Sequence, residues 1–266
     1  MNHLQNKAFA TRSVHAGERL NREGLNPVVG PIHPSVGYTF ADSHDLDAVL
    51  GNEKPGFVYS TRYANPTVAA LETAVANLEG AADAHAFASG MAAIHIALLA
   101  AGVRVGTAVV AAADIYGATY TLLQQIFSEL GAHIHFVDVT QLDEVQKTVA
   151  QARPVALFVE TISNPLMKVA DLPRLAEIAH NRDALFMVDN TFCTPYLCNP
   201  IQFGADMVIH SATKFIGGHG DVMGGIVATS SALKERLLTV NKLIGSSIGP
   251  FEAWLALRGL KTLTLR

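Results

Sequence analysis

Short apolar runs alternate along most of the chain with segments in which apolar residues recur every three or four positions. Runs such as VALFVET and ALFMVDN are apolar nearly throughout, which is typical of a strand that is buried on both faces. The segments between these runs have the period of a helix. This alternation predicts an α/β fold: a mostly parallel, seven-stranded sheet covered by helices on both faces.

The expected elements can be placed along the sequence. The strands are expected near His85, Thr107, His133, Val155, Ala184, Asp206 and Gly224. One helix is expected over residues 66–78, with Pro66 in its first turn, and others from Gly90, Gly117, Gln141, Asp171 and Ala232. Prolines at positions 27, 31, 34 and 55 interrupt the first 56 residues, so we expect an irregular, extended N-terminal arm.

Composition narrows the class of protein. Half of the 266 residues are hydrophobic and 16% are charged, which predicts a packed globule. The net charge is −4 and no basic block occurs, so nucleic acid is not an expected partner. No apolar run is long enough to span a membrane, and the N-terminus has no signal-peptide pattern. With only two cysteines, the sequence predicts a cytoplasmic location.

Functional residues are expected directly after the strands, because ligands of such sheets bind beyond the carboxyl ends of the strands. In ASGMAAI, the backbone N–H groups of Gly90 and Met91 would form an anion site at a helix N-terminus. A plain helix cap by Ser89 is an equally good interpretation. Tyr116, in DIYGATY, would stack on a flat ring or simply pack against its neighbours.

Later strands are followed by further polar groups. Asn164 comes shortly after Glu160 in VETISNP, where Asn-Pro is also a turn signal. Asp189 ends a very apolar strand, and a buried carboxylate needs a positive partner such as a protonated ring nitrogen. Alternatively, Asp189 caps the next turn.

The segment HSATKFIGGHGD contains the most unusual combination. Lys214 is a candidate for Schiff-base chemistry, and Ser211 and Thr213 would offer hydroxyl donors to a phosphate. Taken singly, the lysine is an ordinary surface charge and the glycines are an ordinary loop. Together, the post-strand residues provide for a phosphate, a flat ring, a pyridinium nitrogen and an aldehyde, which are the four parts of pyridoxal 5'-phosphate. No metal site is expected.

The sequence resembles the Cys/Met-metabolism, or transsulfuration, family of fold-type-I pyridoxal-phosphate enzymes, which includes cystathionine γ-lyase and γ-synthase. The resemblance is carried by TRYANPTVAALE, ASGMAAI, YGATY, VETISNP, VDNTFCTPY, HSATKFIGGHGD and AWLALRGLKTL. It implies a carbon–sulfur lyase or transferase that acts on cystathionine or an O-acyl-homoserine. Methionine γ-lyase and O-acetylhomoserine sulfhydrylase are alternatives; Ala118, where methionine γ-lyases carry cysteine, disfavours the former.

The resemblance also implies roles for individual residues. Lys214 would join the cofactor's aldehyde and move protons, and Asp189 would pair with the ring nitrogen. Tyr116 would stack on the ring and act as a second catalytic residue, an acid or base. Asn164 would lie near the ring's 3-oxygen. The cofactor phosphate would be bound by Gly90, Met91, Ser211 and Thr213. Tyr59 and Arg62 would reach the phosphate of a neighbouring subunit, so a homo-oligomer, most often a tetramer, is implied.

Two departures from the family pattern affect these expectations. One extra residue separates Tyr59 from Arg62, which makes the role of Tyr59 the less secure. The family continues into a C-terminal domain that binds the substrate carboxylate, and no residue here can be assigned that task. We therefore expect residues 1–56 to form the arm, 57–250 the cofactor-binding domain, and 251–266 the start of a linker helix to that further domain.

Features of other functional classes are weaker in this sequence. GSSIG, with Ser247, fits the hydrolase pattern G-x-S-x-G, but a helical segment precedes it instead of a strand. No dinucleotide or P-loop motif occurs. His133 and His135 share a strand face but have no third ligand. A non-catalytic chain that binds the cofactor or a partner is the remaining alternative.

Overall fold

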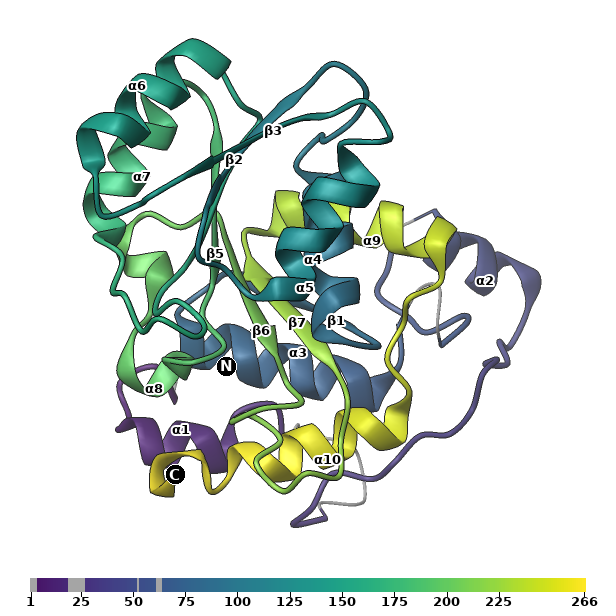
Figure 1. Cartoon of the computed structure of the whole chain (residues 1–266). Helices are drawn as coiled ribbons and strands as arrows, with labels where there is room; N and C mark the ends of the chain where they lie inside the picture. Colours follow the sequence, from purple (N-terminus) through teal and green to yellow (C-terminus); the bar gives the residue numbers. More distant parts are fainter. Residues whose placement is uncertain (1–3, 19–26, 52, 61–63) are drawn as a thin grey trace.

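A computed structural model describes residues 4–18, 27–51, 53–60 and 64–266 of the chain (Figure 1). These residues form a seven-stranded sheet in the order β1-β7-β6-β5-β4-β2-β3. The strands are β1 (Asp83–Phe87), β2 (Ala108–Ala112), β3 (His133–Val137), β4 (Ala156–Glu160), β5 (Leu185–Asp189), β6 (Met207–Ser211) and β7 (Gly225–Thr229). All seven lie where the apolar runs predict them.

The sheet is mostly parallel, as expected. β7 is antiparallel to both of its neighbours, β1 and β6, whereas all other neighbouring pairs are parallel. Six strands therefore point the same way and end at one edge of the sheet. Every position of β2, β4 and β7 is buried, which explains why their sequences lack a polar face.

Helices cover the sheet on both sides: α6 and α7 lie on one side in Figure 1, and α4 and α5 lie on the other. The predicted helices are α3 (Pro66–Glu79), α4 (Gly90–Ala100), α5 (Gly117–Thr121), α6 (Leu142–Ala152), α7 (Leu172–His180) and α9 (Ser231–Ile244). A π-helix, η2 (Leu122–Phe127), extends α5. Short helices α8 (Thr194–Leu197) and η3 (Pro200–Phe203) follow β5. The expected fold class is confirmed.

The N-terminal segment is less irregular than its prolines suggest. It contains two helices, α1 (Phe9–His15) and α2 (Ser43–Leu50). The prolines at positions 27, 31, 34 and 55 all lie outside them. α2 begins after Asp42, whose side chain accepts a hydrogen bond from the backbone of Asp45, and α1 packs against α3. The expectation of a wholly irregular arm was therefore wrong for these two stretches.

The C-terminal segment is helical. α10 (Pro250–Leu260) packs along α3, and a 3-10 turn, η4 (Leu263–Leu265), follows it. A helix was expected over this stretch, and it contacts the main fold directly. Within the described ranges, no helix combines the length and the apolar character needed to cross a membrane.

Candidate cofactor site

A cavity of about 250 Å³ opens at the edge where the parallel strands end. Eight predicted site residues line it: Gly90, Met91, Tyr116, Asn164, Asp189, Ser211, Thr213 and Lys214. They come from the ends of five strands, β1, β2, β4, β5 and β6, or the segments that follow them, as the sequence predicts. Tyr59 does not line this cavity: it is 43% exposed and its backbone forms a bridge with Gly37. Arg62 lies outside the described residues.

The N-terminus of α4 forms one wall of the cavity. Ser89 precedes the helix, and its hydroxyl accepts a hydrogen bond of 3.1 Å from the backbone N–H of Ala92. The N–H groups of Gly90 and Met91 have no acceptor among the described residues. The capping interpretation of Ser89 is therefore correct, and it is compatible with an anion site, because the cap satisfies a deeper N–H and leaves these two available.

Gly90 is required here by the close approach of β6. A Cβ atom at this position would lie 2.8 Å from the Cβ of Ser211 and 2.9 Å from its Oγ. The backbone of Ser211 is in turn fixed, because its N–H donates a 2.8 Å hydrogen bond to the Oγ1 of Thr191. The helix N-terminus and the Ser211 side chain therefore converge on one small region of the cavity.

Lys214 follows β6 in a loop whose backbone is held by several hydrogen bonds. Its carbonyl accepts a hydrogen bond from the N–H of Gly218 at 2.8 Å, and the N–H of Gly224 donates to the Oγ1 of Thr213 at 3.1 Å. The guanidinium of Arg266, after α10, donates to the carbonyls of Phe215 at 2.9 Å and of Ile216 at 3.1 Å. The lysine therefore projects into the cavity from a well-anchored backbone.

The carboxylate of Asp189 is oriented by the residue two positions along the chain. Its Oδ1 accepts hydrogen bonds from the N–H of Thr191 at 2.9 Å and from the Thr191 hydroxyl at 2.5 Å. Among the described residues, no hydrogen bond reaches Oδ2. Burial raises the pKa of Asp189 above its usual range, and the hydrogen bonds from Thr191 oppose that shift. A cation in the cavity would stabilise the ionised carboxylate.

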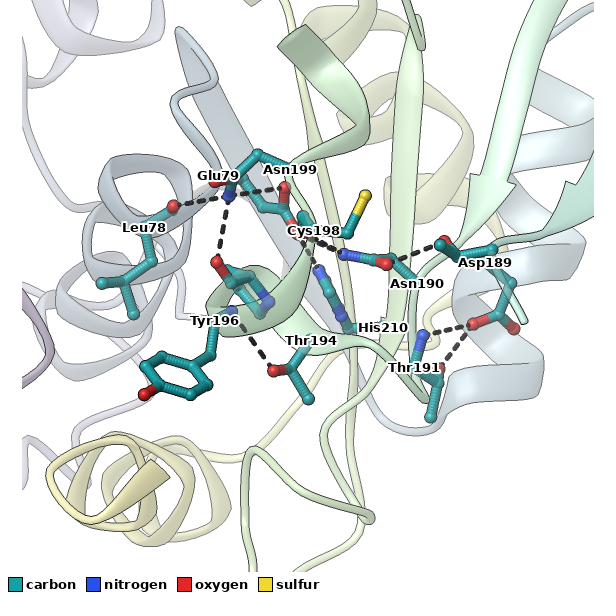
Figure 2. A network of polar contacts seen from close by, with 12 residues as sticks. Leu78, Glu79, Asp189, Asn190, Thr191, Thr194, Tyr196, Cys198, Asn199 and His210 are labelled. Carbon is teal, nitrogen blue, oxygen red and sulfur yellow. Dashed lines mark hydrogen bonds and ion pairs between the residues drawn. The ribbon is translucent and has the colours of Figure 1, made fainter. Parts of the chain in front are cut away.

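A buried polar network lies next to these groups (Figure 2). Because side chains alternate along a strand, Asp189 and Ser211 face the cavity while Asn190 and His210 point away from it. Glu79, which is fully buried, accepts hydrogen bonds from Asn190 at 3.0 Å and pairs with His210 at 2.6 Å. Asn190 also accepts a 2.7 Å bond from the hydroxyl of Thr161. The network fixes the ends of β4, β5 and β6, and so the residues that line the cavity.

Glu160 lines the cavity beside Asp189. The two residues are register partners on the adjacent strands β4 and β5. Oε1 of Glu160 accepts a 2.8 Å bond from the N–H of Tyr116, and Oε2 accepts one of 2.8 Å from the N–H of Asn164. Burial, together with the nearby carboxylates of Asp189 and Asp114, raises the pKa of Glu160 to about 7, although the two hydrogen bonds act in the opposite direction.

The fold and this site can be compared with known proteins. A family model described as "Cys/Met metabolism PLP-dependent enzyme" matches residues 10–266. The chain belongs to this family. It is 41% identical over 265 residues to an O-succinylhomoserine sulfhydrylase of Pseudomonas aeruginosa, covering 99% of this chain and 64% of the relative. It is 45% identical over 212 residues to a cystathionine gamma-lyase of Bacillus subtilis, covering 79% of this chain and 55% of the relative.

One solved structure with a similar fold carries a pyridoxyl-lysine group. A Campylobacter jejuni chain described as an O-acetylhomoserine (thiol)-lyase, with pyridoxyl-lysine monophosphate in place, superposes with a TM-score of 0.90. The two chains are 28% identical, and the match covers 98% of this chain and 72% of that one. Cystathionine gamma-synthase from Xanthomonas oryzae, in complex with cystathionine, superposes with a TM-score of 0.89 at 35% identity, covering 98% and 64%.

The cavity of this family member fits pyridoxal phosphate on its own geometry. The helix N-terminus offers two N–H groups without acceptors beside the hydroxyl of Ser211, which suits a phosphate. Asp189 has one carboxylate oxygen that no described group engages and is buried enough to favour a cationic partner. Lys214 lines the same cavity. Donors, carboxylate and amine are thus arranged around one space.

Several lining residues were not assigned a role from the sequence: Ile94, Glu160, Ile162, Thr191, Phe192 and Met223. Glu160 and Thr191 are the important omissions, because one fixes the loops that carry Tyr116 and Asn164 and the other orients Asp189. Glu160 had a sequence signal, since it is a charged residue at the end of an apolar strand. The bond from the Thr191 N–H is the turn cap by Asp189 that the sequence offered as an alternative, whereas the bond from the Thr191 hydroxyl had no sequence signal.

The described residues form neither a serine-hydrolase site nor a metal site. GSSIG connects α9 to α10, so no strand leads into Ser247 as a nucleophile elbow requires. No group of three or more metal-binding side chains is present in the described part of the chain, and His133 and His135 lie on the edge strand β3.

Proposed function

We propose that this chain binds pyridoxal phosphate in the cavity at the carboxyl ends of the strands, with Lys214 as the residue that joins the cofactor's aldehyde. The main support for the proposal is that Lys214, Asp189 and the N-terminus of α4 all line one cavity. When bound, pyridoxal phosphate acts as an electron sink for the carbanion formed from an amino acid.

The surroundings of the predicted site residues suggest a role for each of them in binding the cofactor or in moving a proton. The N–H groups of Gly90 and Met91 would bind the phosphate, with the hydroxyls of Ser211 and Thr213 beside them. The open Oδ2 of Asp189 would accept a hydrogen bond from the ring nitrogen and keep it protonated. The amine of Lys214 would move a proton at the substrate carbon.

Tyr116 and Asn164 belong to the loops that follow β2 and β4. Tyr116 is 46% exposed and lines the cavity, so its ring is available to stack on the cofactor. Asn164 would lie near the ring's 3-oxygen. Tyr59 and Arg62 would serve the phosphate of a neighbouring subunit, which makes the active unit a homo-oligomer.

The proposed reaction is the cleavage or exchange of a carbon–sulfur or carbon–oxygen bond at the γ carbon of cystathionine or an O-acyl-homoserine. Relatives with 36–45% identity are described as sulfhydrylase, cystathionine lyases, cystathionine gamma-synthase and L-methionine gamma-lyase, so identity alone does not select among them. Nothing in the cavity's lining singles out one of these substrates. Methionine γ-lyase and O-acetylhomoserine sulfhydrylase remain the alternative activities.

The chain spans 64% of the P. aeruginosa sulfhydrylase and 55% of the B. subtilis lyase. Our division of the chain into an arm, a cofactor-binding domain (57–250) and a linker helix is part of the proposal. The substrate's carboxylate would be bound by a further domain, after α10. A chain that binds the cofactor or a partner without turnover is the second candidate, because the described cavity contains no arginine to bind that carboxylate.

The experiment that tests cofactor binding is a spectral titration. Added pyridoxal phosphate should give the purified chain a visible absorption band. The band should be absent in Lys214→Ala but kept in Lys147→Ala, which removes an exposed lysine from α6. A band of equal strength in Lys214→Ala would refute the proposal.

Turnover, location and assembly need separate measurements. Release of α-keto acid from cystathionine, methionine, cysteine and O-acyl-homoserines would rank the substrates, and absence of release from all of them would favour the non-catalytic candidate. Light scattering should give the mass of a dimer or tetramer. Fractionation of cells should place the protein in the cytoplasm.

A further inference from the structure

One carboxylate, that of Glu160, accepts hydrogen bonds from two loops that line the cavity. Glu160 ends β4 and is only 7% exposed. Its two oxygens are used separately: Oε1 accepts the N–H of Tyr116 and Oε2 accepts the N–H of Asn164, both at 2.8 Å. Tyr116 ends the loop that leads from β2 into α5, and Asn164 lies in the loop after β4. The same side chain therefore sets the backbone position of both residues.

A second link between the same loops does not depend on Glu160. Lys168, downstream of Asn164, pairs at 3.3 Å with Asp114, upstream of Tyr116, and at 3.3 Å with Asp138 after β3. These ion pairs hold the outer part of the loops together. They do not reach the N–H groups of Tyr116 and Asn164, which depend on Glu160 alone among the described residues.

On balance, the surroundings of Glu160 disfavour its ionised form and raise its pKa. The groups that face it are Asp189 on β5, Asp114 in the loop after β2, and the two N–H donors. Lys214 lines the cavity from the end of β6. The two carboxylates and burial favour the protonated form, whereas the two N–H groups favour the ionised form. A protonated carboxyl has an O–H on one oxygen, so it accepts well at only one of the two N–H groups.

We propose that Glu160 is a positioning residue whose ionised carboxylate holds Tyr116 and Asn164 in place together and releases one of them on protonation. The description of these two residues as cofactor-facing rests on the proposed function, but the two hydrogen bonds do not. Ionisation of Glu160 thus fixes the two cavity-lining loops that carry Tyr116 and Asn164.

The direct test is hydrogen–deuterium exchange at the backbone amides of Tyr116 and Asn164, measured on the full chain without added cofactor. Rates are converted to protection factors, which removes the intrinsic dependence of exchange on pH. In the wild-type chain, protection of at least one of the two amides should rise about tenfold or more as the pH rises through about 7. In Glu160→Gln it should be low and independent of pH.

The matched control is Glu235→Gln, which removes the same charge from an exposed position on α9. It should show the wild-type rise. Protection in Glu160→Gln within about twofold of wild type at every pH, or a wild-type profile without a rise, would overturn the inference. Circular dichroism of each variant confirms that the fold is retained. If Glu160→Gln does not fold, Glu160→Asp, which keeps the charge but shortens the reach, should lose protection of one amide at high pH.

Cofactor affinity provides the second measurement. The ratio of dissociation constants for pyridoxal phosphate, Glu160→Gln over wild type, should be close to one below pH 6 and should rise to about tenfold above pH 8. Titration of the free cofactor is common to both proteins and cancels in this ratio. A chain that shows the exchange effect but takes up no cofactor would refute the proposed function alone; normal cofactor uptake without the exchange effect would refute this inference alone.

Discussion

The close approach of Gly90 to Ser211 gives a prediction with an internal control. Gly90 and Gly117 are both the first residue of a helix that follows a strand end. A Cβ atom at Gly90 would lie 2.8 Å from the Cβ of Ser211 and 3.2 Å from its Cα, whereas a Cβ at Gly117 would meet nothing within 4 Å. Ser211 cannot retreat easily, because its backbone is paired with β7 and bonded to Thr191.

Two opposing contributions determine how the Gly90→Ala substitution changes the free energy of unfolding. Alanine is favoured over glycine within a helix by up to about 1 kcal/mol. Overpacking in a tight region costs about 1–3 kcal/mol. The free energy of unfolding should therefore fall by about 1–2 kcal/mol in Gly90→Ala. In Gly117→Ala, where only the first contribution acts, it should stay constant or rise by up to about 1 kcal/mol.

Urea unfolding followed by circular dichroism measures both variants against the wild-type chain. Gly90→Ala should also bind pyridoxal phosphate at least about tenfold more weakly, because the displaced helix N-terminus would carry the proposed phosphate donors away from Ser211. The reasoning would be refuted if Gly90→Ala matched Gly117→Ala in both stability and affinity.

Three further predictions follow from buried groups. Glu79→Ala should lower the free energy of unfolding in urea by about 3–5 kcal/mol, because it leaves His210 buried without its partner; a loss below about 1 kcal/mol would show that the network is unimportant. The pKa of Glu160 is raised from 4.5 to about 7 in the folded chain. Between these pH values the folded chain therefore keeps a proton that the unfolded chain has already released. Its contribution to stability should therefore fall by roughly 3 kcal/mol as the pH rises through that interval, and this fall should be missing in Glu160→Gln. Burial, helped by Cys193 and Glu79, raises the pKa of Cys198 to about 11, so iodoacetamide at pH 8 should alkylate it roughly a hundredfold more slowly than the same thiol in the unfolded chain; equal rates would contradict this.

The sheet and most helices were predictable because burial on two faces leaves a strong signal. Strands such as β4 and β7 are buried at every position, so their sequences are apolar without interruption. The residues at their ends were predictable for the same reason, since a polar side chain after such a run falls at the edge where ligands bind. Lys214 and Asp189 are examples.

Local hydrogen bonding was the harder part. α2 depends on a cap by Asp42, in a segment where nearby prolines pointed to irregular structure. The functions of Glu160 and Thr191 depend on contacts with residues from other strands and turns, which periodicity along the chain does not contain. The pairing of Glu79 with His210, 131 positions away, is likewise visible only after the chain has folded.

The most direct test of the central claim is to locate the covalently bound cofactor. The purified chain is mixed with pyridoxal phosphate, reduced with borohydride, digested and analysed by mass spectrometry. The account predicts the added mass on the peptide that contains Lys214, with little on any other lysine. Label spread over exposed lysines, or concentrated on one of them in preference to Lys214, would contradict it.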